Sequence, residues 1–129
     1  MLNETFDNQE KLFRAIKLHL TEWWDVEQNR PTSAAFKDRL GVSVDREGGR
    51  TIDDCNIFLL NRFGALKAIV HITYEKCISL GAHPKYAPEQ DNEFHCLITT
   101  PEGTVPVTQA AAKKLSRSVE VSYINNENT

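Results

Sequence analysis

Residues 51–73 constrain the fold more than any other segment, because they predict a helix that leads almost directly into a strand. Thr51 is a good N-cap, and the acidic pair Asp53 and Asp54 lies where the positive end of a helix dipole favours carboxylates. Gly64 is a natural helix end. Residues 66–73 then alternate between a fully apolar and a mixed face, as a central or half-covered strand does. The chain therefore contains both a helix and a sheet.

Other segments add shorter elements to this pair. Alternating apolar residues predict three further strands, at residues 42–45, 93–98 and 119–124. Helices are predicted at residues 74–80 and 109–117, the second rich in alanine with cations near its end. The two prolines of residues 83–92 predict a loop.

Residues 9–24 allow two interpretations. Phe13, Ile16, Leu20 and Trp23 follow one another at steps of three and four residues, which favours a helix with one apolar face. Apolar and polar residues also alternate toward Leu20, so a strand over residues 12–20 is the competing interpretation. Pro31 ends whatever precedes it, since it disfavours a helical residue before it.

These elements predict a small single domain of the α+β class. They lack the regular strand, helix and strand rhythm of a doubly wound sheet, so we expect a mostly antiparallel sheet of about four or five strands with three or four helices packed on it. With 129 residues, 40% of them hydrophobic and 26% charged, the chain has the composition of a soluble globular domain. We expect the domain to span residues 5–124, followed by a frayed polar tail at 125–129.

The net charge limits which binding partners are expected, and the number and placement of the cysteines indicate the cellular compartment. The net charge of −3 argues against nucleic acid and against an anionic membrane as partners. The apolar runs are too short to span a bilayer. The odd set of three cysteines lies within apolar patterns and forms no CxxC pair, which favours a reducing, cytoplasmic location.

Residues 30–50 are the most site-like segment, because they combine five basic side chains, three hydroxyls and three glycines. Guanidinium forks, hydroxyls and glycine amides together suit a phosphate or a carboxylate. Neither GxxxxGK[ST] nor GxGxxG is present, and the competing interpretation is a solvated loop whose charges pair with its own acids. The candidate ligand-binding residues are Arg30, Ser33, Ser43, Arg46 and Arg50.

His95 is the candidate catalytic residue. It falls on the more polar face of its predicted strand, as does His71, and the two imidazoles come close if their strands are neighbours. A histidine of this kind can act as a general base, and Ser33 or Ser43 with Asp45 would supply the other residue types of a serine triad, although no GxSxG elbow is present. Imidazoles on strands more often only form hydrogen bonds.

We predict no metal site and no cofactor. Consecutive residues such as His95 and Cys96 point to opposite faces of a strand and cannot chelate one ion together. The pair Trp23 and Trp24 is a separate feature, because adjacent rings cannot both lie at the centre of one helix face. Trp24 is therefore the candidate contact for a protein partner, and packing of both rings in the core is the alternative.

Two functions follow from these features. The first is an accessory domain that engages a protein partner or an anionic ligand through the basic segment at residues 30–50. The second is a small nucleotide-handling transferase or hydrolase. An early arginine, Arg14, followed by serine-bearing strands with Ser33, Ser43 and Arg46 is similar to small ADP-ribosyltransferase-like domains. That resemblance covers only these positions and implies that they hold a pyrophosphate or a ribose.

Overall fold

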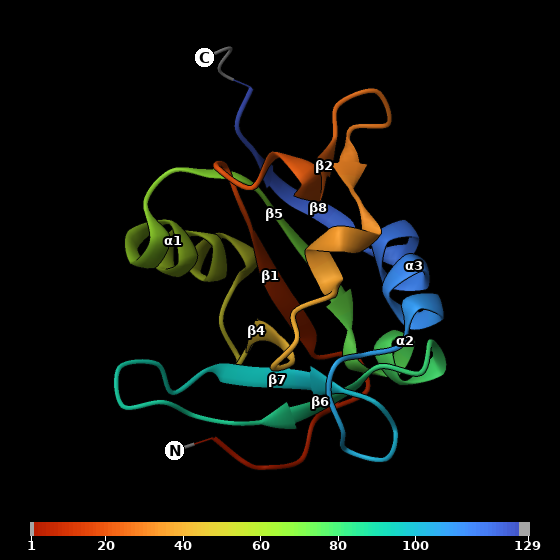
Figure 1. Ribbon diagram of the computed structural model, residues 1–129. Helices are drawn as coiled ribbons and strands as arrows, with labels where there is room; N and C mark the ends of the chain where they lie inside the picture. The colour runs from red at the N-terminus through yellow and green to blue at the C-terminus, as the bar shows by residue number, and fades with distance from the viewer. Residues whose placement is uncertain (1, 127–129) are drawn as a thin grey trace.

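The computed structural model describes residues 2–126 and shows a single α+β domain built on one large sheet. Three α-helices and two short 3-10 helices pack around this sheet, and a two-stranded hairpin lies beside it (Figure 1). In chain order the elements are β1 (Lys11–Lys17), η1 (Thr21–Trp23), β2 (Trp24–Asp25), β3 (Arg30–Pro31), η2 (Ser33–Phe36), β4 (Val42–Arg46), α1 (Ile52–Phe63), β5 (Leu66–Thr73), α2 (Tyr74–Ser79), β6 (His83–Tyr86), β7 (His95–Thr99), α3 (Gln109–Ser118) and β8 (Glu120–Ile124).

The main sheet has six strands in the order β6-β7-β4-β1-β5-β8, and every neighbouring pair is antiparallel. Helix α1 covers one face of the sheet, while α2 and α3 cover the other (Figure 1). The predicted α+β class and antiparallel sheet are therefore confirmed, with more strands than expected. The additional strands come from two segments that the sequence pattern assigned differently.

The first of these is β1, where the predicted helix over residues 9–24 is wrong and the competing strand is right. Residues 12–16 are all buried, and β1 pairs with β5 along its whole length. A strand buried on both faces needs apolar residues on both, so its pattern loses the clean alternation that identifies a half-exposed strand. Trp23, which completed the apparent helical stripe, belongs instead to the short helix η1.

The second is β6, which forms within the segment predicted as a loop. Pro84 lies in this strand, opposite Ile98 of β7. Because β6 is the last strand at its edge of the sheet, a residue without an amide proton removes no bond to a further strand. Proline content alone could not exclude an edge strand.

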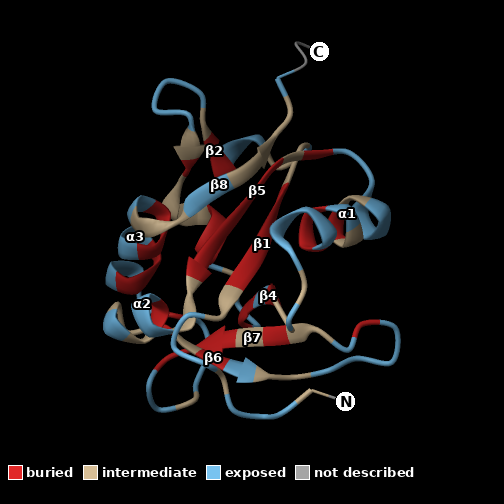
Figure 2. Ribbon diagram, turned by 180° about the vertical axis from the view of Figure 1, so that it is seen from behind, coloured by how far each residue is buried: buried red, intermediate tan, exposed pale blue. Residues whose placement is uncertain are grey.

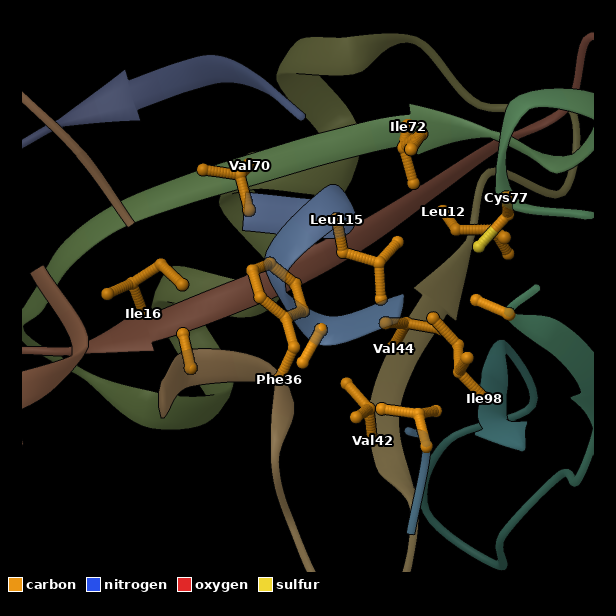
Figure 3. Close-up of a cluster of buried hydrophobic side chains, with 14 of the residues drawn as sticks. Leu12, Ile16, Phe36, Val42, Val44, Val70, Ile72, Cys77, Ile98 and Leu115 are labelled. Carbon is orange, nitrogen blue, oxygen red and sulfur yellow. The ribbon is translucent and has the colours of Figure 1, made fainter. Parts of the chain in front are cut away.

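The sheet separates two hydrophobic clusters of unequal size. The larger one lies under α2, α3 and η2, and the close-up shows Phe36 and Leu115 meeting the side chains of β1, β4 and β5 (Figure 3). The smaller one lies under α1 and contains Phe13, Leu59 and four other buried residues. Figure 2 shows β1 and β5 as the buried centre between these two layers.

Each α-helix begins at a threonine that caps it. The Oγ1 atom of Thr51 accepts the amide of Asp54 at 3.1 Å, and Thr73 and Thr108 cap α2 and α3 in the same way. Gly64 ends α1 with a positive φ of 75°. The predicted beginning and end of α1 are both confirmed.

Within residues 2–126, no helix combines the length and hydropathy needed to cross a bilayer. Asn125 of the predicted tail exchanges hydrogen bonds with Lys67 through backbone and side-chain atoms. The rest of that tail, residues 127–129, lies outside the described residues.

Candidate functional site

The sheet divides between its two central strands, β1 and β4. These strands pair at only two positions, Leu12 with Arg46 and Phe13 with Asp45, although both strands continue beyond them. In Figure 1, β7 runs across the direction of β1 and β5, so the sheet is strongly bent at this junction. We call the opening on the α1 side of this junction the split-sheet cleft.

Arg14 bridges β1 and β4 where their ladder ends. Its guanidinium group donates to the Ser43 carbonyl at 2.9 Å and to the Ala35 carbonyl at 2.9 and 3.1 Å. It also forms an ion pair with Asp38 at 3.1 Å and stacks over the ring of Trp23. The Arg14 side chain thus makes a hydrogen bond between β1 and β4 beyond the last pair of their backbone ladder. This bond opposes both closing and widening of the gap between the two strands.

A cavity of about 230 Å³ occupies the split-sheet cleft. The end of α1 forms one wall with Leu59, Arg62 and Phe63, and the segment before β7 contributes Glu89 and Asn92. The polar face of β4 and β7 forms the floor, because residues two apart on a strand share a face. The cavity therefore lies over the polar strand face that the sequence places beside the glycine turn at residues 48–49.

Asp45 is the most unusual group in this cavity. It is 5% exposed, and its Oδ1 atom accepts a hydrogen bond of 2.8 Å from the Asn92 side-chain amide. The Asn92 amide is itself oriented, because its oxygen accepts the Phe94 amide. The second carboxyl oxygen, Oδ2, is buried and has no hydrogen-bond partner among the described residues. Burial raises the pKa of Asp45, and the bond from Asn92 and the nearby cations only partly oppose it.

Ser43 and His95 meet at the mouth of the cavity. His95 stands opposite Asp45 in the pairing of β4 with β7, and its Nε2 atom lies 3.1 Å from the Ser43 hydroxyl. Its Nδ1 atom lies 2.8 Å from the Ala87 carbonyl. The same two residues also line a second, more open hollow of about 760 Å³, bordered by Leu40 and Leu97. They therefore stand between an inner cavity and an outer hollow.

The other candidate ligand residues lie apart from this pair. The Arg46 guanidinium is buried beneath the N-terminal segment, where it pairs with both oxygens of Glu10 and donates to the carbonyls of Asn3 and Thr5. Burial by itself raises the pKa of Glu10, but the bonds from Arg46 and the Gly48 amide together hold it below its usual value. This cluster holds residues 3–10 against the sheet.

Arg30, Ser33 and Arg50 occupy three further places. Arg30 donates to the Ser116 carbonyl near the end of α3. Arg50 donates to two carbonyls of its own turn and stacks over the ring of Phe94, 3.4 Å from its centre. Ser33 begins the short helix η2 on the far face. The structure thus brings Ser43 and His95 together, whereas the guanidinium groups of Arg30, Arg46 and Arg50 each bind acceptors of the protein itself.

Trp24 and His71 also have different surroundings from those expected. Both tryptophans are buried, Trp23 at 9% and Trp24 at 8% exposure, which confirms the alternative in which both pack in the core. Burial of the ring removes the reason for expecting a partner contact at Trp24, and that contact stays a prediction. His71 lies on β5, which β1 and β4 separate from the strand of His95. The two imidazoles therefore do not meet.

The sequence pattern missed several residues of the cavity, among them Asn92 and Arg62. Asn92 lies in the proline-containing segment and Arg62 on an exposed turn of α1, so neither stands out from the many polar residues around it. The detectable signal was the alternation of Ser43 and Asp45 on a strand whose other face is apolar. Within residues 2–126, no group of three histidine, cysteine or acidic side chains is arranged to hold a metal ion.

Comparisons of the chain with protein-family models, with curated proteins and with solved structures found no match.

Proposed function

We propose that this protein is a small cytoplasmic binding domain that holds a small hydroxylated anion in the split-sheet cleft. One observation carries the proposal: Asp45 lines a cavity, and its buried Oδ2 atom has no partner among the described residues. A buried polar atom left unpaired costs about 1–3 kcal/mol. A small displacement of the atoms that cover this oxygen would expose it to a ligand, and a bond from the ligand would then remove that cost and favour the bound state.

The chemistry of Asp45 favours a hydroxyl group at this point. Since burial raises the pKa of Asp45, the carboxyl is closer to taking up a proton than an exposed aspartate is. A hydroxyl can donate to a carboxylate and can accept from a carboxylic acid, whereas an ammonium group can only donate. A hydroxyl therefore suits both protonation states of Asp45.

Cations at the α1 end of the cavity favour a negative charge on the same ligand. The Nζ atom of Lys17 and the Cζ atom of Arg62 lie 5.4 and 5.7 Å from the ring centre of Phe63, and all three residues line the cavity. Arg62 pairs with Glu89 and Asp91, but these pairs are exposed to water and are therefore weak. A carboxylate or phosphate of the ligand can compete with them for the guanidinium fork.

The size of the cavity limits the ligand. A water molecule takes about 30 Å³ of liquid volume, so a cavity of 230 Å³ suits a molecule of about seven or eight non-hydrogen atoms. Small hydroxy acids such as glycerate and 2-hydroxybutyrate have this size. A larger anion such as glycerol 3-phosphate fits only if it extends into the outer hollow.

Thermal unfolding with three matched compounds tests the proposal. Glycerate carries both the hydroxyl and the charge, propionate only the charge, and glycerol only the hydroxyls. A ligand that binds the folded state stabilises it by about 2.7 kcal/mol at a hundred times its dissociation constant. We expect glycerate to raise the melting temperature most, and we expect Asp45→Asn and Arg62→Gln each to reduce that shift.

Arg117→Gln is the matched control, because Arg117 is an exposed cation on α3 at the opposite face. The shift should survive this change. An equal shift with propionate would remove Asp45 from the proposal, and stabilisation by an amine of the same size, but not by glycerate, would reverse the proposed charge of the ligand.

A protein partner and anion binding through Arg30, Arg46 and Arg50 stay predictions. Each of these arginines would first have to release its present acceptors to bind a ligand. In the split-sheet cleft the cation that must release acceptors is Arg62, whose pairs with Glu89 and Asp91 are exposed to water, and for that reason we place the ligand there.

A further inference from the structure

We infer that Ser43 is a nucleophile activated by His95 and that the cleft accepts carboxylic esters. The inference rests on the proposed ligand cleft, and it adds an activity to that binding function. Its starting point is the pair of contacts made by the two ring nitrogens of His95, one to the Ser43 hydroxyl and one to the Ala87 carbonyl.

These contacts assign the protons of the neutral imidazole. A carbonyl oxygen can only accept, so the Nδ1 atom, 2.8 Å from the Ala87 carbonyl, carries the proton. The Nε2 atom then has a free lone pair and accepts the Ser43 hydroxyl, 3.1 Å away. The Ser43 hydroxyl is thus bonded to a base, and a third group holds that base in one tautomer. This is the arrangement in which a serine is activated as a nucleophile.

The strands hold this pair in position without a loop. Ser43 and His95 lie on adjacent strands, and the pairing of Asp45 with His95 fixes their register. The Ala87 carbonyl is held as well, because the Ala87 amide donates to the His95 carbonyl at 3.0 Å. The Ser43 residue is exposed, so a substrate can reach its hydroxyl.

The two hollows on either side of the pair suit the two halves of an ester. The inner cavity has the polar groups proposed to bind a small hydroxylated anion, so it suits an acid half that keeps a free acidic group in addition to its esterified carboxyl. The outer hollow is bordered by Leu40 and Leu97, and Leu40 is 84% exposed, so it suits an apolar alcohol half. Because Ser43 and His95 line both, the ester carbonyl would lie beside the Ser43 oxygen.

The reaction balances with water as the second reactant. The Ser43 oxygen attacks the carbonyl carbon, and its proton passes to Nε2 of His95. Collapse of the tetrahedral intermediate breaks the bond to the alcohol oxygen, which takes that proton and leaves. Water then attacks the acyl-serine, gives its proton to His95, and the proton returns to the Ser43 oxygen as the acid departs.

An activated ester tests the inference directly. The intact protein is mixed with p-nitrophenyl acetate, and released nitrophenolate and the mass of each tryptic peptide are followed. We expect a burst of about one nitrophenolate per protein and an acetyl group on the peptide that contains Ser43. Ser43→Ala should abolish the burst, and His95→Gln should slow it by about 10²–10⁴-fold.

Ser79→Ala and His19→Gln are the matched controls, because both residues are exposed and lie outside the cleft. They should leave the burst unchanged. Acetyl groups on lysines alone, or an undiminished burst in Ser43→Ala, would overturn the inference.

The two proposals fail separately. A glycerate-dependent thermal shift without acetylation of Ser43 would leave the binding function standing and remove the activity. Acetylation of Ser43 with no thermal shift from any anion would instead show a reactive serine in a cleft that does not select hydroxylated acids.

Discussion

At the scale of single residues, buried polar groups differ in how many of their donors and acceptors form hydrogen bonds within the protein. Arg46 and Glu10 form a pair with two bonds between charged groups, and neighbouring carbonyls bind the remaining donors. Asp45 receives one bond, on one of its two oxygens. Removing one partner of a buried pair typically costs about 3–5 kcal/mol, so the first arrangement stabilises structure. The second leaves one buried oxygen without a partner among the described residues, and this is the atom that the proposed ligand would bind.

The first prediction concerns the pH dependence that Asp45 imposes on stability. Its folded pKa is raised, so between the unfolded and the folded pKa the folded state holds a proton that the unfolded state has released. The free energy of unfolding therefore falls as the pH rises through this interval, and the loss is complete above the folded pKa. Asp45→Asn lacks this dependence. We expect the variant to gain stability relative to the wild type as the pH rises from about 4 toward 8.

Urea unfolding at several pH values measures this difference, and comparing the two proteins cancels groups with the opposite trend, such as Glu10. The quantity compared is the free energy of unfolding of Asp45→Asn minus that of the wild type. If it stays constant or falls as the pH rises, the pKa of Asp45 is not raised in the folded state.

At the scale of elements, the sequence predicts the local structures that carry their own signals. The cap at Thr51, the stop at Gly64 and the alternation at residues 66–73 each depend on neighbouring residues, and all three are confirmed. The sequence left β1 open between helix and strand, because its pattern is set by burial on both faces, which depends on strands far away in the sequence. The cleft could be predicted only as a polar strand face. Its geometry arises where β1 and β4 diverge, and no short pattern encodes that.

The turn between β4 and α1 gives the second prediction, through two adjacent glycines with positive φ. A Cβ atom at Gly48 would lie 2.9 Å from two ring carbons of Phe94, whereas a Cβ atom at Gly49 would meet nothing within 4 Å. Both alanine variants pay a similar backbone cost, since φ is 60° at Gly48 and 78° at Gly49. Gly48→Ala also forces the ring of Phe94 away from Arg50. We expect it to be the less stable variant by about 1–3 kcal/mol.

Chemical unfolding of Gly48→Ala and Gly49→Ala under identical conditions gives this difference directly. Equal losses of stability would show that backbone conformation alone accounts for the cost, and that the Phe94 ring moves aside freely.

At the scale of the whole molecule, the sheet carries two layers of unequal strength. The layer under α2 and α3 joins most of the buried hydrophobic residues, whereas α1 buries only Cys55, Asn56 and Leu59 against the other face. Regions with few buried apolar contacts open at lower free energy than the rest of a fold. We therefore expect the wall of the split-sheet cleft that α1 provides to open more easily than the layer under α2 and α3.

The third prediction uses the three free cysteines as reporters of this difference. Cys55 lies in the layer under α1, and Cys77 and Cys96 lie in the larger one. Burial raises the pKa of Cys55 to about 11 and the pKa values of Cys77 and Cys96 to about 12, so alkylation requires opening of the structure. With iodoacetamide under native conditions, we expect Cys55 to be modified first, as followed by peptide mass spectrometry. Equal rates at all three thiols would indicate that the domain opens only as one unit.

The bridge made by Arg14 has a consequence for the evolution of the cleft. A continuous ladder of backbone bonds fixes the spacing of two strands. Beyond the last pair of β1 and β4, the length of the Arg14 side chain instead sets how far apart the two strands lie. A shorter or differently shaped residue at this one position would change the width of the opening while leaving every other strand pair in register. Under the proposed function, the size of the ligand that the cleft selects would then change with one substitution.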